Sequence, residues 1–364
     1  MFGKEVLKKL SPYQQGKQIE EIKAQYQLDQ VVKLSSNENP YGFSEHVKEV
    51  LQNQLDLLHI YPDGYASKLR TALANQLGVE EQQLVFGSGS DELIQIICRT
   101  FLYDGTNTVM ATPTFTQYKH HSLIEGAEIV EVPTKDGYHQ LDEMIMAIND
   151  MTKVVWICAP DNPSGTMIHK NDLLDFLKQC PSHVIVVLDE AYYEYIDPDH
   201  RIYGIDLLKT YPNLVLLRTF SKAYGIAALR IGYAITSEQV ADKLNVVRGP
   251  FNTTTLTQEA ALSALFDQSF IHETVTKNKR VKQLFQRSLA DIGWEYYPSQ
   301  TNFVLVKTPI SGLEVFDYLI RYGYIVRPGE LLGYPNTIRV TIGTEEDMLS
   351  LSKVILQLDN ETKK

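Results

Sequence analysis

The residues best suited to chemistry lie in residues 219–232, where Ser221 and Lys222 stand beside small residues and Arg230 follows. The apolar run at 214–217 before this segment, and a shorter one after it, predict a loop between two buried strands. A lysine held among apolar neighbours near an arginine has its ammonium form disfavoured, so it is available as an amine nucleophile. A lysine that forms a Schiff base needs this property. The lysine of an isolated Ser-Lys pair is usually an ordinary surface residue, so this interpretation depends on partner residues earlier in the chain.

Three upstream segments contain candidate partners. Residues 87–92, Gly-Ser-Gly-Ser-Asp-Glu, follow a short strand and open a helix, where backbone N–H groups can bind a phosphate. Asp189 follows five apolar residues, so it is either a capping acid of the core or the partner of a buried cation. Residues 159–165 contain Asn162 in an Asn-Pro-x-Gly turn. Each segment alone also fits an ordinary cap or turn.

The elements that must position these residues alternate along the chain. We expect strands at 83–86, 107–111, 127–132, 153–158, 183–188 and 214–217, and helices at 93–102, 114–125, 140–149 and 170–179. Continuous apolar strands alternating with helices predict an α/β fold, a mostly parallel sheet flanked by helices on both faces. Ligands of such sheets bind beyond the carboxyl ends of the strands. We therefore expect residues 89–92, Asn162, Asp189, Tyr192 and Lys222 to face one crevice.

The two ends of the chain differ from this alternation. Helices are expected at 18–27, at 44–58 with Ser44 as N-cap, and at 66–76. A long helical region at 256–289 precedes strands at 303–306, 324–327 and 337–343 and helices at 313–322 and 345–358, which predict a smaller α+β domain. The expected division is an N-terminal arm with part of the small domain at 1–43, a large domain at 44–255, and a small C-terminal domain at 256–364.

Composition narrows the class of protein. The 364 residues are 44% hydrophobic and 22% charged, with a net charge of −11, which disfavours general binding to nucleic acids or anionic membranes. The three cysteines, Cys98, Cys158 and Cys180, match no metal-site spacing and are expected to be reduced core residues, so no metal is expected. The N-terminus has no apolar signal-peptide core and no apolar run is long enough to span a membrane, so a cytoplasmic protein is expected.

The order of these motifs resembles the fold type I pyridoxal-phosphate aminotransferases. Within them the chain is similar to the histidinol-phosphate aminotransferase family, and the resemblance covers essentially the whole chain. The segments that carry it are Leu10-Ser11-Pro12-Tyr13-Gln14-Gln15-Gly16-Lys17, Leu34-Ser35-Ser36-Asn37-Glu38-Asn39-Pro40, Tyr61-Pro62-Asp63-Gly64 and Ile338-Arg339-Val340-Thr341-Ile342-Gly343. The resemblance implies transamination between histidinol phosphate and 2-oxoglutarate, giving imidazole acetol phosphate and glutamate, in histidine biosynthesis.

The resemblance also assigns roles around the cofactor, pyridoxal 5′-phosphate. Lys222 is expected to form the Schiff base and to carry the proton between the substrate Cα and the cofactor. Asp189 is expected to keep the pyridine nitrogen protonated, which makes the ring an electron sink. Asn162 and Tyr192 are expected to hydrogen-bond the ring 3′-oxygen, and Phe115 to stack on the ring.

The same resemblance assigns the cofactor phosphate and the assembly. Ser90 and Asp91, through their backbone N–H groups, together with Ser221 and Arg230, are expected to hold the phosphate. Tyr61 is expected to reach the cofactor phosphate of a neighbouring subunit. This implies a homodimer with its active sites at the interface.

Substrate binding must serve both an α-carboxylate and a phosphate ester. Arg339 is expected to bind both anions, because a guanidinium suits carboxylate and phosphate alike. Arg327 would add a second charge for the phosphate, although it could also be a solvated arginine. Tyr13 and Asn39 are expected to close over the substrate.

Two other enzyme functions remain open at this point, and a third, non-enzyme role is disfavoured. An aromatic-amino-acid aminotransferase would use the same arginines, and a threonine-phosphate decarboxylase-like enzyme would use the same cofactor residues. Aminotransferase-like domains also occur in transcription regulators, which carry an added helix-turn-helix domain. Here the matching motifs begin near residue 10, and the chain is acidic, so an enzyme is expected.

Overall fold

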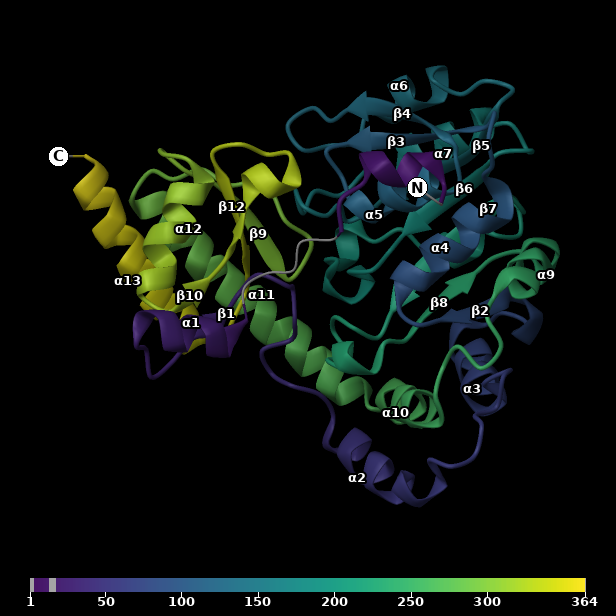
Figure 1. The fold of residues 1–364 in the computed structure, drawn as a ribbon, viewed down its shortest axis with the longest axis horizontal. Helices are drawn as coiled ribbons and strands as arrows, with labels where there is room; N and C mark the ends of the chain where they lie inside the picture. The colour runs from purple at the N-terminus through teal and green to yellow at the C-terminus, as the bar shows by residue number, and fades with distance from the viewer. Residues whose placement is uncertain (1–2, 13–17, 364) are drawn as a thin grey trace.

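The computed structural model describes residues 3–12 and 18–363, and within them a seven-stranded sheet forms the centre of the larger lobe (Figure 1). The strand order is β2-β8-β7-β6-β5-β3-β4, and β8 runs antiparallel to both of its neighbours while the other pairs are parallel. The strands are β2 (Leu84–Gly87), β3 (Asn107–Thr112), β4 (Glu128–Pro133), β5 (Thr152–Cys158), β6 (Ile185–Asp189), β7 (Leu214–Thr219) and β8 (Gly232–Ile235). The mostly parallel sheet expected from the apolar runs is confirmed.

Helices cover both faces of this sheet, because side chains alternate along each strand. In β5, Val155 and Ile157 join one core, whereas Val154 and Trp156 join the other. The first face carries α3 (Ser67–Leu77), α6 (Leu141–Met146), α7 (Lys170–Gln179), α8 (Gly204–Leu207) and α10 (Thr255–Phe266). The second face carries α4 (Ser90–Phe101), α5 (Thr116–Ile124) and α9 (Glu238–Val247). Asp189 ends β6 in register with Cys158 of β5, whose side chain belongs to the second core.

A smaller lobe has its own apolar core. It holds an antiparallel sheet of order β11-β12-β9 and a parallel pair of β1 with β10. Its elements are β1 (Val32–Lys33), β9 (Phe303–Lys307), β10 (Tyr324–Ile325), β11 (Arg327–Pro328), β12 (Thr337–Thr341), α1 (Ile19–Tyr26), α12 (Gly312–Arg321) and α13 (Glu345–Thr362). The single strand expected at 324–327 is thus two short strands in different sheets.

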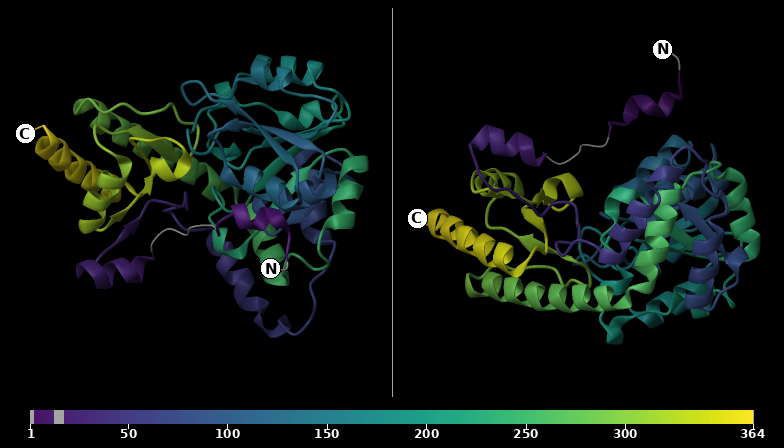
Figure 2. Two further views of the ribbon diagram at one scale, coloured as in Figure 1. Left: turned by 45° about the horizontal axis from the view of Figure 1, so that its top comes forward. Right: turned by 90° about the horizontal axis from the view of Figure 1, so that it is seen from below.

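Helix α11 (Gln268–Asp291) connects the two lobes (Figure 2). It buries Ile271 in the core of the larger lobe, and Val281 and Phe285 in the core of the smaller one. The helical region expected at 256–289 is two helices, because Asp267 ends α10 and its side chain accepts a hydrogen bond from the Phe270 N–H at 3.1 Å. Aspartate is favoured at the N-cap of a helix and is less favourable in the interior of one.

The expected helix at 44–58 is also shorter than predicted. Ser44 is its N-cap, as expected, accepting from the His46 N–H at 3.3 Å, but α2 (Glu45–Asn53) ends before a separate turn, η2. The short 3₁₀ helices are η1 (Glu5–Lys9), η2 (Leu55–Leu57), η3 (Glu81–Gln83), η4 (Tyr193–Tyr195), η5 (Pro198–His200), η6 (Ala227–Leu229) and η7 (Gly329–Leu332). Over the described ranges, no helix combines the length and apolar character needed to cross a membrane.

Candidate active site

A cavity of about 530 Å³ lies where the carboxyl ends of the parallel strands face the smaller lobe. Most of the residues expected from the sequence line it: Ser90, Asp91, Phe115, Asn162, Asp189, Tyr192, Ser221, Lys222, Arg230, Arg327 and Arg339. The reversed strand β8 explains how Arg230 reaches this edge. Because β7 and β8 are antiparallel, the residues that follow Thr219 and those that precede Gly232 emerge side by side.

Lys222 projects into the cavity from the loop after β7. Its Nζ donates to the Ser36 carbonyl at 3.2 Å and lies 5.7 Å from the centre of the Tyr192 ring. Burial, and then the nearby Arg339 guanidinium, lower the pKa of Lys222 to about 8, although Asp91 and Glu38 act in the opposite direction. The free amine is therefore still the minor form at pH 7, but it is far more populated than in an exposed lysine, as a nucleophile or proton carrier requires.

Asp189 lies on the cavity wall with 3% of its surface exposed. Its carboxyl accepts from the Tyr118 hydroxyl at 2.6 Å and from the Ala191 N–H at 3.1 Å. Burial raises the pKa of Asp189 to about 6, and the Tyr118 hydrogen bond partly opposes that rise. Among the described residues no cation pairs with this carboxyl, so it is suited to receive a positive charge from a ligand.

Tyr192 is held by the segment that precedes Asn39. Asn37 donates to the Tyr192 hydroxyl at 2.9 Å, and the Asn37 side-chain oxygen accepts from the Thr341 hydroxyl at 3.0 Å. Burial raises the pKa of Tyr192 above its usual range, so the hydroxyl remains a proton donor. Asn37 has a φ of 58°, a left-handed conformation that asparagine tolerates better than most residues.

The N-terminus of α4 and the Lys222 loop form an anion-binding corner. The Ser221 hydroxyl oxygen accepts from Arg230 Nη1 at 3.3 Å and from Thr219 Oγ1 at 3.0 Å, which leaves its own O–H for a ligand. Gly89 has a φ of +81°, and a Cβ placed there would collide with the Arg230 guanidinium. The corner therefore combines helix N–H groups, a hydroxyl and an arginine around a space that a side chain would fill.

Two arginines of the smaller lobe line the same cavity. Arg327 of β11 is directly opposite Arg339 of β12 in the antiparallel pair. Arg339 Nη1 donates to the Asn162 side-chain oxygen at 2.6 Å, and its Nη2 donates to the Ser35 carbonyl at 2.7 Å. Because the Asn162 side-chain oxygen accepts this hydrogen bond, the amide N–H groups of Asn162 point away from Arg339.

The remaining predicted residues lie elsewhere. Asn39 does not line the cavity; its Nδ2 donates to the Ala223 carbonyl at 2.9 Å, and the cavity wall is formed by Ser35, Ser36, Asn37 and Glu38 instead. Tyr61 is 80% exposed on the surface and stacks on Phe251 at 5.0 Å. Tyr13 lies outside the described residues. The three cysteines are free thiols, as expected.

Sequence reasoning missed Tyr118 and Asn37. Tyr118 is fully buried on α5, stacks on Trp156 at 4.8 Å and meets Phe115 edge-on at 5.5 Å. Its spacing of three residues from Phe115 places both on one helix face, a signal that could have identified it. Asn37 lies in a segment dense in turn formers, and no spacing connects it with Thr341, which is 304 positions away.

The fold and the cavity together define the class I and II aminotransferases: residues 29–355 match the model of that family, and the chain belongs to it. Histidinol-phosphate aminotransferase 2 of Oceanobacillus iheyensis is 56% identical over 362 residues, which are 99% of this chain and 100% of that protein. Histidinol-phosphate aminotransferase of Bacillus subtilis is 51% identical over 98% of this chain and 99% of that protein. The structure of histidinol-phosphate aminotransferase from Sinorhizobium meliloti, in complex with pyridoxal-5′-phosphate, superposes with a TM-score of 0.88 at 28% identity and covers 97% of each chain.

Proposed function

We propose that this chain is a pyridoxal-phosphate-dependent histidinol-phosphate aminotransferase. It transfers the amino group of histidinol phosphate to 2-oxoglutarate, giving imidazole acetol phosphate and glutamate in histidine biosynthesis. The observation that carries the proposal is the identity of 56% to a histidinol-phosphate aminotransferase over 99% of the chain. The paired arginines and the anion-binding corner, which line the same cavity, support it.

The cavity fits the cofactor. Asp189 is a buried carboxyl without a cationic partner among the described residues, as a protonated ring nitrogen requires. The glycine-lined corner at α4 suits a phosphate, since a Cβ on Gly232 would lie 2.8 Å from the Ser90 backbone nitrogen. Lys222 supplies an amine of lowered pKa to an aldehyde. Ser90, Asp91, Ser221 and Arg230 would hold the phosphate, and Asn162, Tyr192 and Phe115 the ring.

When bound, the cofactor ring supplies an electron sink for the negative charge that develops at the substrate Cα. Lys222 takes the Cα proton and returns it, which its lowered pKa permits near neutral pH. Asp189 holds the ring nitrogen in its charged form. Tyr192 and Asn162 donate hydrogen bonds to the ring oxygen and so orient the ring.

Arg339 and Arg327 select the substrates. Arg339 binds the carboxylate of glutamate or the phosphate of histidinol phosphate, and Arg327, opposite it across the β11–β12 pair, adds the second charge that a phosphate dianion needs. Asn39 and Tyr13 remain candidates for closing over the substrate. Aromatic-amino-acid transamination is a second candidate, because a largely apolar cavity of about 580 Å³ adjoins the site and shares Phe115 and Arg327 with it.

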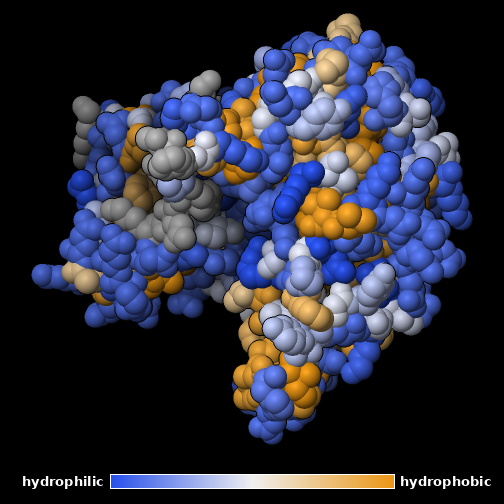
Figure 3. All heavy atoms as spheres, turned by 45° about the vertical axis from the view of Figure 1, so that its right-hand side comes forward, coloured by the Kyte–Doolittle hydropathy of each residue, from blue (hydrophilic) through white to orange (hydrophobic). Residues whose placement is uncertain are grey.

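We further propose that the active unit is a homodimer. The segment from η2 to Tyr65 exposes a run of large apolar side chains: Leu55, Leu57, Leu58, Ile60, Tyr61 and Tyr65. Figure 3 shows apolar residues gathered on the projection at the bottom of the molecule, where Figure 1 places α2. A contiguous exposed apolar surface of this kind marks an interface, and a second copy would place Tyr61 at its partner's cofactor phosphate.

One assay tests the proposed reaction. Purified enzyme is offered histidinol phosphate and phenylalanine separately, each with 2-oxoglutarate, and glutamate formation is measured. We expect a higher kcat/KM for histidinol phosphate. A higher value for phenylalanine would instead assign the aromatic function, and turnover of neither would reject both.

A further inference from the structure

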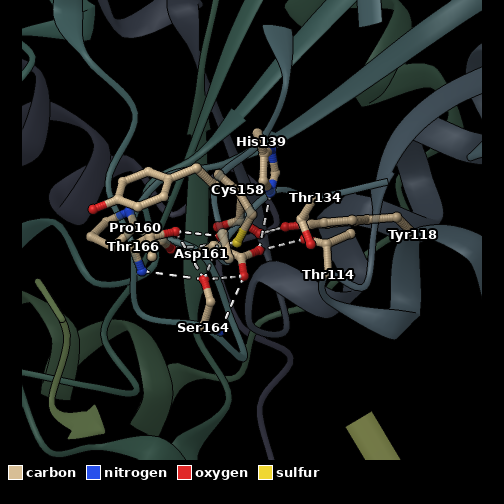
Figure 4. Close-up of polar contacts among 12 residues, drawn as sticks. Thr114, Tyr118, Thr134, His139, Cys158, Pro160, Asp161, Ser164 and Thr166 are labelled. Atoms are coloured by element: carbon tan, nitrogen blue, oxygen red, sulfur yellow. Dashed lines mark hydrogen bonds and ion pairs between the residues drawn. The ribbon is translucent and has the colours of Figure 1, made fainter. Parts of the chain in front are cut away.

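A buried polar cluster is centred on Asp161, the residue before Asn162 of the cavity wall (Figure 4). The Asp161 side chain is 1% exposed. Its Oδ1 accepts from the Thr114 hydroxyl at 2.6 Å and from His139 Nε2 at 3.1 Å. Its Oδ2 accepts from the Ser164 N–H at 3.1 Å and from the Ser164 hydroxyl at 2.8 Å. Both oxygens are thus saturated by donors, which satisfies a buried carboxylate without a charged partner.

The tautomer of His139 follows from its surroundings. His139 Nδ1 is buried and has no hydrogen-bond partner among the described residues. An N–H at that position would be an unsatisfied buried donor, which is costlier than an unsatisfied lone pair. The proton is therefore on Nε2, where it is donated to Asp161.

The carboxylate joins three segments that are distant in the chain. Thr114 belongs to the turn before α5, His139 follows the turn at 135–138 after β4, and Ser164 belongs to the loop after β5. Two of these segments also carry residues of the cavity wall: Phe115 follows Thr114 directly, and Asn162 follows Asp161. One rigid contact, Thr114 to Asp161, thus sets the separation of those two side chains.

We propose that Asp161 and Thr114 are positioning residues, which hold Phe115 against one face of the cofactor ring while keeping Asn162 at its ring oxygen. Neither side chain needs to touch the cofactor: Thr114 acts through Phe115, and Asp161 acts through Asn162. This inference rests on the proposed cofactor function. Its test distinguishes a failure of the positioning role from a failure of the proposed function.

The test compares two substitutions of the same chemistry. Thr114→Val removes the hydroxyl that reaches Asp161. Thr108→Val is the matched control: Thr108 lies in β3, away from the cavity, and its fully buried hydroxyl donates to the Val154 carbonyl of the neighbouring strand β5 at 2.8 Å. Thr114→Ser keeps the hydroxyl and should restore wild-type behaviour. The cofactor-free proteins are titrated with pyridoxine 5′-phosphate, which has the ring and phosphate but no aldehyde, and thermal melting is recorded for each.

We expect Thr114→Val to weaken this binding by about tenfold, because Phe115 and Asn162 lose the contact that holds their segments together. The visible circular dichroism of its pyridoxal-phosphate form should also fall. Thr108→Val should lower the melting temperature by a similar amount and leave both readouts unchanged. Unchanged binding in Thr114→Val, or equal weakening in Thr108→Val, would overturn the positioning role. Failure of the wild-type protein itself to bind would instead reject the proposed function.

Discussion

Burial lowers the pKa of both Lys222 and Lys282 to about 8, but of these two residues it is Lys222 that lines the cavity. Lys282 donates instead to the carbonyls of Ser299 and Thr301, each at 2.8 Å. A lowered pKa alone therefore does not identify a reactive lysine. Position at the carboxyl edge of the sheet, in the cavity that Asp189 also lines, distinguishes the two.

Replacing Lys222 tests its role in the chemistry. Lys222→Ala should reduce turnover by about a thousandfold or more, because the proton carrier is lost. The yellow colour expected of the wild-type holoenzyme should be lost as well. The measurements are steady-state kinetics and the visible absorption spectrum. Lys282→Ala is the control: it should lower thermal stability and keep the colour, and a fully active Lys222→Ala enzyme would refute the mechanism.

The buried Asp189 carboxyl should lower the stability of the cofactor-free protein while being needed for activity. Its pKa is raised from 3.8 to about 6, so the folded cofactor-free protein loses stability as the pH rises from about 4 to about 6, and the loss persists above that range. Asp189→Asn should therefore raise the free energy of unfolding of the cofactor-free protein at pH 8 by no more than about 3 kcal/mol, which is measured as a higher melting temperature. Activity should fall steeply, since the ring nitrogen loses its charged partner. Normal activity in this variant would reject the electron-sink role.

Arg327 should distinguish the two classes of substrate. Arg327→Gln should lower kcat/KM for histidinol phosphate by roughly tenfold more than for phenylalanine, because a phosphate dianion gains more from a second guanidinium than a carboxylate does. Steady-state kinetics with both substrates provide the measurement. Arg321→Gln, at an exposed position of α12, is the control. Equal losses on both substrates would remove Arg327 from phosphate recognition.

At the scale of elements, the central strands were predictable because their runs are apolar and buried on both faces; β4, at the edge, is more exposed and was predictable from its short apolar run. Residues just past the strand ends could be assigned to one edge because parallel strands all end at the same edge of the sheet. The reversal of β8, which brings Arg230 to that edge, follows from pairing between distant strands rather than from local pattern. Contacts such as Asn37 with Thr341, and Asp161 with Thr114, likewise depend on tertiary packing that no spacing encodes.

The start of α4 offers a prediction with a matched control. Gly89→Ala should weaken binding of pyridoxal phosphate, because the new Cβ collides with the Arg230 guanidinium. Gly78→Ala has a similar positive φ of +68° but nothing within 4 Å of its Cβ. Both variants should lose roughly 1 kcal/mol of stability from backbone strain. Titration of the cofactor-free proteins should show weaker binding in Gly89→Ala alone; equal affinity in the two variants would contradict a close-packed phosphate corner.

For the whole molecule, the division at residues 43 and 255 remains a prediction. α10 buries Ala260 and Ala261 in the core of the larger lobe, and α11 contributes to both cores. The connection is therefore a continuous helix rather than a flexible linker. Relative movement of the lobes would have to bend or tilt α11.

The proposed dimer makes a prediction at this scale. Leu58→Asp, at a 64% exposed position of the apolar surface, should shift the protein to monomers and reduce activity together, because charge is disfavoured in a buried interface. Light scattering coupled to size-exclusion chromatography gives the mass. Met146→Asp, on a 76% exposed side chain of α6, is the control and should change neither. An active Leu58→Asp monomer would remove Tyr61 from the partner's site.

The hydrogen bond between Asn37 and Thr341 joins positions 304 residues apart. On the ribosome, the seven strands of the larger sheet are complete once residue 235 has emerged, yet Tyr192 cannot receive its final support until Asn37 meets β12. Since chains grow at roughly 5–20 residues per second, the larger lobe waits on the order of ten seconds for that strand. A nascent chain therefore carries an incomplete vitamin-binding pocket until β12 has emerged.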